Sequence, residues 1–168
     1  MPANMTAPCD EGLINIRVGA IILKDGKFLM ARNDRDAYFY SVGGRIQFGE
    51  TAGEAVAREV AEETGVRMEI DRLGFIHENY FYGDVGGVNK DKLVYEVSFY
   101  FYMKVPDGFE PVGESHTDEG RVREWMEWVA PDDPRTIYPE FFREELKRPE
   151  QTVKHFVTDE RVNGSCVS

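Results

Sequence analysis

Cysteine, long apolar runs and positive charge are all scarce in this chain of 168 residues. The two cysteines, Cys9 and Cys166, lie near opposite ends of the chain, which excludes a disulfide framework and favours a reducing, cytoplasmic location. No run of 18 apolar residues occurs, so the sequence predicts no transmembrane helix and no membrane partner. The first twelve residues have neither the basic start nor the apolar core of a secretory signal.

The excess of negative charge indicates which kinds of binding partner to expect. Twenty lysines and arginines stand against 31 aspartates and glutamates, a net charge of −11. An acidic surface does not favour the phosphate backbone, so we expect no polymeric nucleic acid partner. Small nucleotides stay compatible with this charge, because a metal ion and a few local arginines suffice to bind them. The length and the 42% hydrophobic content fit a single domain.

An amphipathic helix is predicted directly after Thr51. Thr51 and Glu54 have the spacing of a capping box, and Gly65 stands where a left-handed residue commonly ends a helix. The intervening run AGEAVAREVAEET contains good helix formers and no proline. Val56 and Val60 fall on one side of this helix, which we expect to face the core.

Three glutamates crowd the other side of the same helix, at positions 59, 62 and 63. Glu59 and Glu63 form a like-charge i, i+4 pair that costs roughly 0.2–0.5 kcal/mol, and acids near a helix C-terminus also oppose the helix dipole. Arg58 offsets part of this cost by pairing with Glu62. One interpretation is a solvated acidic face, and the other is a site for a divalent cation, which prefers oxygen ligands.

The residues upstream favour the cation site. Gly44 to Val66 fit the pattern G-x5-E-x7-R-E-U-x-E-E-x-G-U, where U is aliphatic, at all nine defining positions over 23 residues. Such a match is far more specific than a lone glycine-rich loop. This segment resembles the Nudix box, the signature of the Nudix hydrolase family. Outside the defining positions, Val42 stands where many members have proline, and Gln47 where many have glutamate.

The resemblance implies a fold and an activity. It implies an α/β protein, specifically an α/β/α sandwich around a mixed β-sheet. It also implies hydrolysis of a small-molecule substrate, a nucleoside diphosphate linked to another moiety X, with water and Mg²⁺ or Mn²⁺ as cofactor. The metal ligands that it implies are the Gly43 carbonyl, Glu50, Glu59, Glu62 and Glu63.

Catalytic roles follow from the same resemblance. Glu59 and Glu63 would act on the metal-bound reaction centre, and Arg58 would orient the glutamates. Family members often supply a further acid or general base from outside the box. Glu119 is the predicted residue for this role, with Glu114 and His116 as alternatives. A solvated loop is the competing interpretation of this segment.

Four further residues are candidates for substrate binding. Arg32 and Arg45 are expected near the box loop, where each would hold phosphate or else be an ordinary surface arginine. Tyr80 and Tyr82 would stack on a nucleobase or else pack in the core. Relatives that act on diadenosine polyphosphates tend to carry a tyrosine in this region, and ADP-ribose pyrophosphatases tend to carry a proline. The tyrosines here therefore favour a diadenosine polyphosphate as the substrate. ADP-ribose and nucleoside triphosphates stay open as substrates.

The remaining pattern predicts a single domain over residues 13–148, an N-terminal tail over 1–12 and a C-terminal tail over 149–168. Residues 33–42 are expected to form a loop, and a helix is expected from about Pro139. Strands are predicted at 14–23, around an Asp25-Gly26 hairpin, at 67–82, at 93–105 and from Arg123.

Two other functions share this fold in the family. A Nudix-like domain that senses a nucleotide without cleaving it is the alternative, although the intact box argues against it. An isomerase of the isoprenoid type would need a cysteine in the core, and both cysteines here are near the ends of the chain. Homodimers are common in the family, so a homodimer is also open.

Overall fold

A computed structural model describes residues 2–83, 92–112, 115–116 and 122–161 of the chain. Two helices and eleven strands lie in this described part. The helices are α1 (Ala52–Thr64) and α2 (Phe142–Glu145). The strands are β1 (Thr6–Cys9), β2 (Gly12–Ile21), β3 (Leu23–Lys24), β4 (Lys27–Asn33), β5 (Phe39–Arg45), β6 (Glu69–Gly83), β7 (Lys92–Lys104), β8 (Ser115–His116), β9 (Arg123–Val129), β10 (Ile137–Tyr138) and β11 (Lys154–Asp159).

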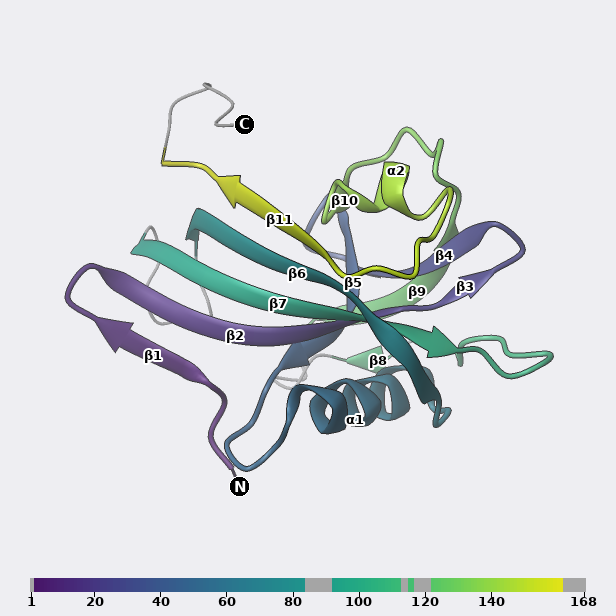
Figure 1. Ribbon diagram of the computed structural model, residues 1–168, viewed down its shortest axis with the longest axis horizontal. Helices are drawn as coiled ribbons and strands as arrows, with labels where there is room; N and C mark the ends of the chain where they lie inside the picture. Colours follow the sequence, from purple (N-terminus) through teal and green to yellow (C-terminus); the bar gives the residue numbers. More distant parts are fainter. Residues whose placement is uncertain (1, 84–91, 113–114, 117–121, 162–168) are drawn as a thin grey trace.

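The sheet is mixed, as expected. Its order is β11-β6-β7-β2-β5-β4-β9-β8, with β1 beside β2, β10 beside β5 and β3 beside β4. The pairs β2–β7, β11–β6 and β10–β5 are parallel, and the other pairs are antiparallel. Figure 1 shows α1 on one side of the sheet and α2 on the other, so the layers are those of an α/β/α sandwich.

Alternation along β2 divides the core between these two sides. Val18 and Ala20 pack in one buried cluster with Val56 and Val60 of α1. Ile21 faces the opposite way and packs in a second cluster, which contains Phe142 of α2 and Phe75 of β6. Because side chains alternate between the faces of a strand, each residue of β2 can be assigned to the α1 side or the α2 side.

Helix α1 forms as the sequence predicts. The Thr51 hydroxyl accepts a hydrogen bond from the Glu54 N–H, and the Glu54 carboxylate accepts one from the Thr51 N–H, which completes the capping box. Gly65 ends the helix in the left-handed conformation, with φ of 75°. Val56 and Val60 are fully buried, which confirms the expected core face.

The strand predictions hold except around the double glycine. β3 and β4 flank the hairpin at Asp25-Gly26, and β6 is one long strand with two register shifts. The expected loop over 33–42 is wrong in its second half, because β5 begins at Phe39 and runs through Gly43-Gly44. Phe39 is buried in the α2-side cluster and Val42 in the α1-side cluster, so this segment gains core burial on both faces.

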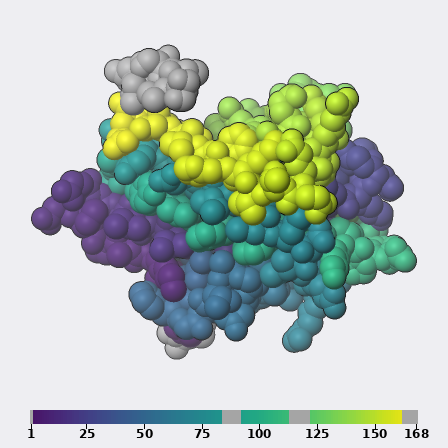
Figure 2. Space-filling view, in the orientation of Figure 1, coloured from purple at the N-terminus to yellow at the C-terminus, as the bar shows by residue number. Residues whose placement is uncertain are grey.

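Both segments expected as tails contribute strands. β1 pairs with the start of β2, and the preceding residues bond to the box loop through Met5 N–H to the Ile46 carbonyl (2.7 Å). β11 adds a parallel strand to β6. Figure 2 shows the C-terminal segment, in yellow, lying over part of β6 and β7. Edge pairing of this kind depends on partners distant in sequence, so local pattern does not reveal it.

The second predicted helix is much shorter than expected. α2 starts at Phe142 rather than near Pro139 and has four residues. Phe142 and Leu146 are buried in the α2-side cluster, which fixes this single turn against the sheet. Among the described residues, no helix is long and apolar enough to cross a membrane.

Candidate active site

The glutamates of α1 meet the double glycine of β5. A Cβ built on Gly44 would lie 2.5 Å from Oε1 of Glu59, so this side chain occupies the space that the missing Cβ leaves. Gly43 has φ of 147°, and a Cβ there would lie 2.1 Å from the carbonyl oxygen of Val18. The two glycines therefore let the strand pass close to both β2 and the acidic face of α1.

Arg58 gathers three of the predicted carboxylates around itself. Its Nε donates to Oε1 of Glu50 at 2.5 Å, and its Nη1 donates to Glu59 at 2.7 Å and to Glu62 at 3.3 Å. Its Nη2 donates to Glu50 and to the carbonyl of Arg45. The hydrogen bonds from Arg58 hold the pKa of Glu50 below its usual value. Glu59 is only 14% exposed, whereas Glu62 is 60% exposed and lies at the rim.

Glu63 has a different environment. Its side chain keeps some contact with solvent, but burial raises its pKa well above the usual value for a glutamate. The negative charges of Glu124 and Glu59 raise it further, and the N–H of Gly43 and the charge of Arg17 oppose the shift. Glu59, Glu63 and Glu124 therefore place three negative charges close together, which favours either a proton or a cation there.

Glu124 is the acid from outside the box that the structure brings to this region. It lies on β9, and its carboxylate accepts a 2.5 Å hydrogen bond from the hydroxyl of Tyr40 on β5. Burial and this bond raise the pKa of Tyr40 far above its usual value. The sequence predicts Glu119 for this role, with Glu114 and His116 as alternatives. Glu114 and Glu119 lie outside the described residues, and of His116 only the backbone of β8 is described.

One signal in the sequence would have found Glu124. In REWMEWV the side chains alternate, and Met126 and Trp128 pack against the α1-side cluster. Glu124 has the same parity and therefore faces α1, whereas Glu127 faces the other way. Choosing Glu124 requires knowing that β9 pairs with β4 near the box, which is a tertiary fact.

The predicted phosphate-binding arginines face away from these carboxylates. Arg32 lies 3.9 Å from Glu127 and packs near the rings of Phe39 and Trp125, on the α2 side of the sheet. Arg45 pairs with Arg17 across β2 and β5, so its side chain also points to the α2 side. Only the backbone carbonyl of Arg45 joins the Arg58 network.

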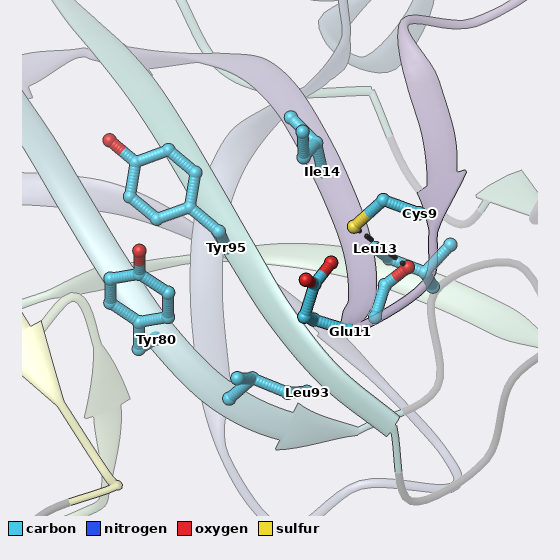
Figure 3. Close-up of a pocket in the computed structure, with 8 residues that line it drawn as sticks. Cys9, Glu11, Leu13, Ile14, Tyr80, Leu93 and Tyr95 are labelled. Atoms are coloured by element: carbon cyan, nitrogen blue, oxygen red, sulfur yellow. Dashed lines mark hydrogen bonds between the residues drawn. The ribbon is translucent and has the colours of Figure 1, made fainter.

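The predicted base-stacking tyrosines lie toward the far end of the sheet. Tyr80 packs against Tyr95, with ring centroids 4.7 Å apart, and Arg161 lies over its ring at 3.5 Å. Tyr80 and Tyr95 line a pocket of about 210 Å³ together with Cys9 and Ile14 (Figure 3). Ile14 is four residues along β2 from Val18, which is roughly 13 Å in a strand. Tyr82 is 55% exposed beyond this pocket.

The donor set fits a hard divalent cation. Glu59, Glu63 and Glu124 would supply carboxylate oxygens to such a cation, and the β5 backbone at Gly43 runs directly beside them. Within the described part of the chain, no three such side chains are close enough to form a preformed metal cluster. Burial is the largest cause of the raised pKa of Glu63, and the negative charges of Glu124 and Glu59 add to it, so a cation at this position would be electrostatically favoured.

Comparison with known proteins agrees with this geometry. The family model described as the NUDIX domain matches residues 14–152, most of the chain. The chain belongs to the NUDIX family. A MutT-like protein of Streptomyces ambofaciens is 36% identical over 74 residues, 44% of this chain and 48% of that protein. The ADP-ribose pyrophosphatase of Methanocaldococcus jannaschii is 29% identical over 59% of this chain and 56% of its own length.

A third relative aligns over more of its length. The 8-oxo-dGTP diphosphatase of Escherichia coli K12 is 29% identical over 70% of this chain and 82% of its own. The matches to the first two relatives span only about half of their lengths. Among solved structures, a MutT protein from Bacillus halodurans has a TM-score of 0.62 at 20% identity, covering 88% of this chain and 92% of that one. At this identity the likeness establishes the fold of this NUDIX chain.

Proposed function

We propose that this NUDIX chain is a divalent-metal-dependent pyrophosphohydrolase. Its substrate class is a nucleoside diphosphate linked to another moiety X, with water as the nucleophile. The observation that carries this proposal is the grouping of Glu59, Glu63 and Glu124 beside Gly43-Gly44, with a strongly raised pKa at Glu63. Relatives named as an ADP-ribose pyrophosphatase and an 8-oxo-dGTP diphosphatase support the reaction class.

Glu59, Glu63 and Glu124 would hold Mg²⁺ or Mn²⁺. Glu50 and Glu62 lie nearby, because both accept hydrogen bonds from Arg58. When bound, the cation neutralises charge on the diphosphate and lowers the pKa of bound water. Arg58 fixes the rotamer of Glu59 and holds Glu50 beside it, so the ligand oxygens are positioned in advance. The Gly43 N–H holds Glu63 against β5.

Proton transfer is assigned to Glu63. Its carboxylate has a raised pKa, so it binds a proton more readily than an exposed glutamate does. A carboxylate with raised proton affinity is a stronger general base than an exposed glutamate, and this applies to an oxygen of Glu63 that the cation would leave free. Tyr40 keeps Glu124 oriented through its hydroxyl, so that the two acids have separate positions.

Phosphate release from a substrate panel tests the proposal. The panel contains ADP-ribose, diadenosine polyphosphates, NADH, nucleotide sugars and nucleoside triphosphates, with Mg²⁺ or Mn²⁺ and a coupled phosphatase. We expect release from one class, its loss on adding chelator, and its loss in Glu63→Gln. Glu69→Gln is the control, since Glu69 is an exposed partner of Lys104. Equal release with and without chelator would contradict the metal dependence.

A further inference from the structure

A patch of polar side chains lies on the α2 side of three neighbouring strands in the sheet. Asn15 of β2 is paired with Glu96 of β7, which is paired with Asn79 of β6. In the next row, Arg17 is paired with Ser98, which is paired with His77. Directly paired residues share a face, and Gly19, Ile21 and Tyr100 of the same parity point toward α2. The polar patch therefore consists of Asn15, Arg17, His77, Asn79, Glu96 and Ser98.

Much of this patch is closed to solvent. Ser98 is 1% exposed, Asn15 2% and His77 6%. Some of the groups satisfy one another, since Asn15 Nδ2 donates to Glu96 Oε2 at 2.6 Å and the His77 ring bonds Thr158 at 2.8 Å. Nearer α2 the same face is aromatic, so an apolar continuation would have been available to the fold.

Two atoms of the patch are buried without a hydrogen-bond partner. These are Nε of Arg17, a donor, and Oδ1 of Asn79, an acceptor. Buried polar groups in folded proteins are normally paired, and unpaired ones concentrate where a ligand or water completes the site.

Arg17 links this patch electrostatically to the glutamates of α1. Burial by itself lowers the pKa of Arg17, but the negative charges of Glu96, Tyr100, Glu63 and Glu59 outweigh burial and raise it. In return, the positive charge of Arg17 lowers the pKa of Glu63. Val18, the next residue of β2, is paired with Gly44, which lies against Glu59, so the patch begins one residue away from the strand pair at the candidate active site.

The chemistry of the patch selects a neutral ligand with both donors and acceptors. Arg17 and Glu96 balance in charge, and the Glu96 carboxylate disfavours a phosphate there. A hydroxyl group both donates and accepts, which suits an unpaired donor and an unpaired acceptor together. Beside His77, Phe141 stacks on Phe156 at 4.3 Å and meets the His77 ring edge-on at 5.1 Å. An aromatic wall next to polar groups matches a sugar ring, which has hydroxyl edges and apolar C–H faces.

Taking the chain as a hydrolase of linked nucleoside diphosphates, we propose that Arg17, Asn79 and Glu96 form a subsite for a hydroxyl-bearing sugar ring of the substrate. Two parts of such a substrate have this chemistry: the ribose of the nucleoside and a sugar that constitutes X. Arg17 and Asn79 are specificity residues in this assignment, and neither takes part in the hydrolytic step.

Binding of non-hydrolysable ligands by calorimetry with Mg²⁺ tests the subsite. The probes are the α,β-methylene forms of ADP-ribose, ADP and 2′-deoxy-ADP, with the uridine series (UDP-glucose, UDP and 2′-deoxy-UDP) run in parallel. The variants are Asn79→Ala and Arg17→Met, with Arg67→Met as a control that removes an exposed positive charge. We expect at least a tenfold loss of affinity in the two patch variants and none in the control.

The probes distinguish the two sources of the sugar. If X occupies the subsite, only the ADP-ribose and UDP-glucose analogues lose affinity. If the nucleoside ribose occupies it, the ADP and UDP analogues lose affinity too, and the 2′-deoxy analogues do not. An equal loss for all probes, wild-type affinity in both patch variants, or no binding of any probe by the wild-type protein overturns the subsite.

Thermal unfolding separates this role from a structural one. Asn79→Ala removes an unpaired buried oxygen, so we expect an unchanged or higher Tm together with weaker sugar binding. A lower Tm with unchanged binding would instead make Asn79 structural and overturn the assignment. Failure of the hydrolase proposal gives a different result, in which the wild-type protein binds the analogues through Asn79 but releases no phosphate from the parent compounds.

Discussion

The carboxylate of Glu59 lies where a side chain on Gly44 would have to be. A Cβ on Gly44 would come within 2.5 Å of Oε1 and 2.6 Å of Cδ of Glu59. No real Cβ contact is this short, so any side chain at position 44 displaces the glutamate. The glycine of the box and its glutamate are therefore one structural unit, although 15 positions separate them in the sequence.

Gly44→Ala should abolish most activity while leaving the fold intact. The clashing atoms belong to the flexible end of Glu59, which can move at little cost to stability, but Glu59 then leaves the position proposed for a metal ligand. We expect turnover to fall at least 100-fold with a Tm close to wild type. Gly53→Ala is the control, because it adds a methyl group to α1, the helix that carries Glu59, at 3.3 Å from Ile70. Wild-type turnover in Gly44→Ala would contradict the proposed role of Glu59.

Glu63→Gln should stabilise the metal-free protein at neutral pH. The folded-state pKa of Glu63 lies above its unfolded value, so the folded protein holds this proton more tightly. Stability from this group is present below about pH 4.5 and is lost as pH rises through the folded pKa. We expect a higher Tm than wild type at pH 7–8 in chelator, shrinking to no difference near pH 4. An increase in Tm that is the same near pH 4 and at pH 7–8 would contradict the raised pKa of Glu63.

Glu124→Gln should reduce activity as strongly as a change within the box. Glu124 raises the pKa of Glu63 and is held by Tyr40, so in the proposed site its charge contributes to binding the cation. We expect a fall in kcat on the order of 100-fold and weaker activation by Mg²⁺. Glu127→Gln is a matched control on the same strand, since Glu127 faces the opposite side and pairs with Arg135. Similar losses of activity in Glu124→Gln and Glu127→Gln would contradict a specific role of Glu124 in the active site.

Arg58→Met should destabilise the protein as well as inactivate it. Glu50 and Glu59 are 19% and 14% exposed and would keep their charges without Arg58. A partly buried charge left without its partner costs about 1–3 kcal/mol. Urea unfolding measures this loss, with Lys147→Met as a control at an exposed pair with Glu144. If Arg58→Met unfolds at the same urea concentration as wild type, Arg58 is not organising these carboxylates.

Local signals determined the parts of the site that lie within one stretch of chain. The capping box, the glycine that ends α1 and the acidic face all depend on contacts within a few residues, and the structure has them as predicted. The double glycine was also recognised, although its place on strand β5 was not, because the burial of Phe39 and Val42 depends on distant elements. The family resemblance rested on this same continuous segment.

Tertiary structure decided what the rest of the chain contributes. Strand pairing turned Arg32 and Arg45 to the α2 side and set Tyr80 and Tyr82 at the far end of the sheet, while it brought Glu124 next to Glu63. It also placed Arg17, Glu96 and Asn79, from three strands, in one polar patch. A change of one residue in strand register would turn each of these side chains to the opposite face of the sheet. The sequence by itself determined the carboxylate helix, from which the reaction class is proposed, and the register of the sheet determined which other side chains lie near it.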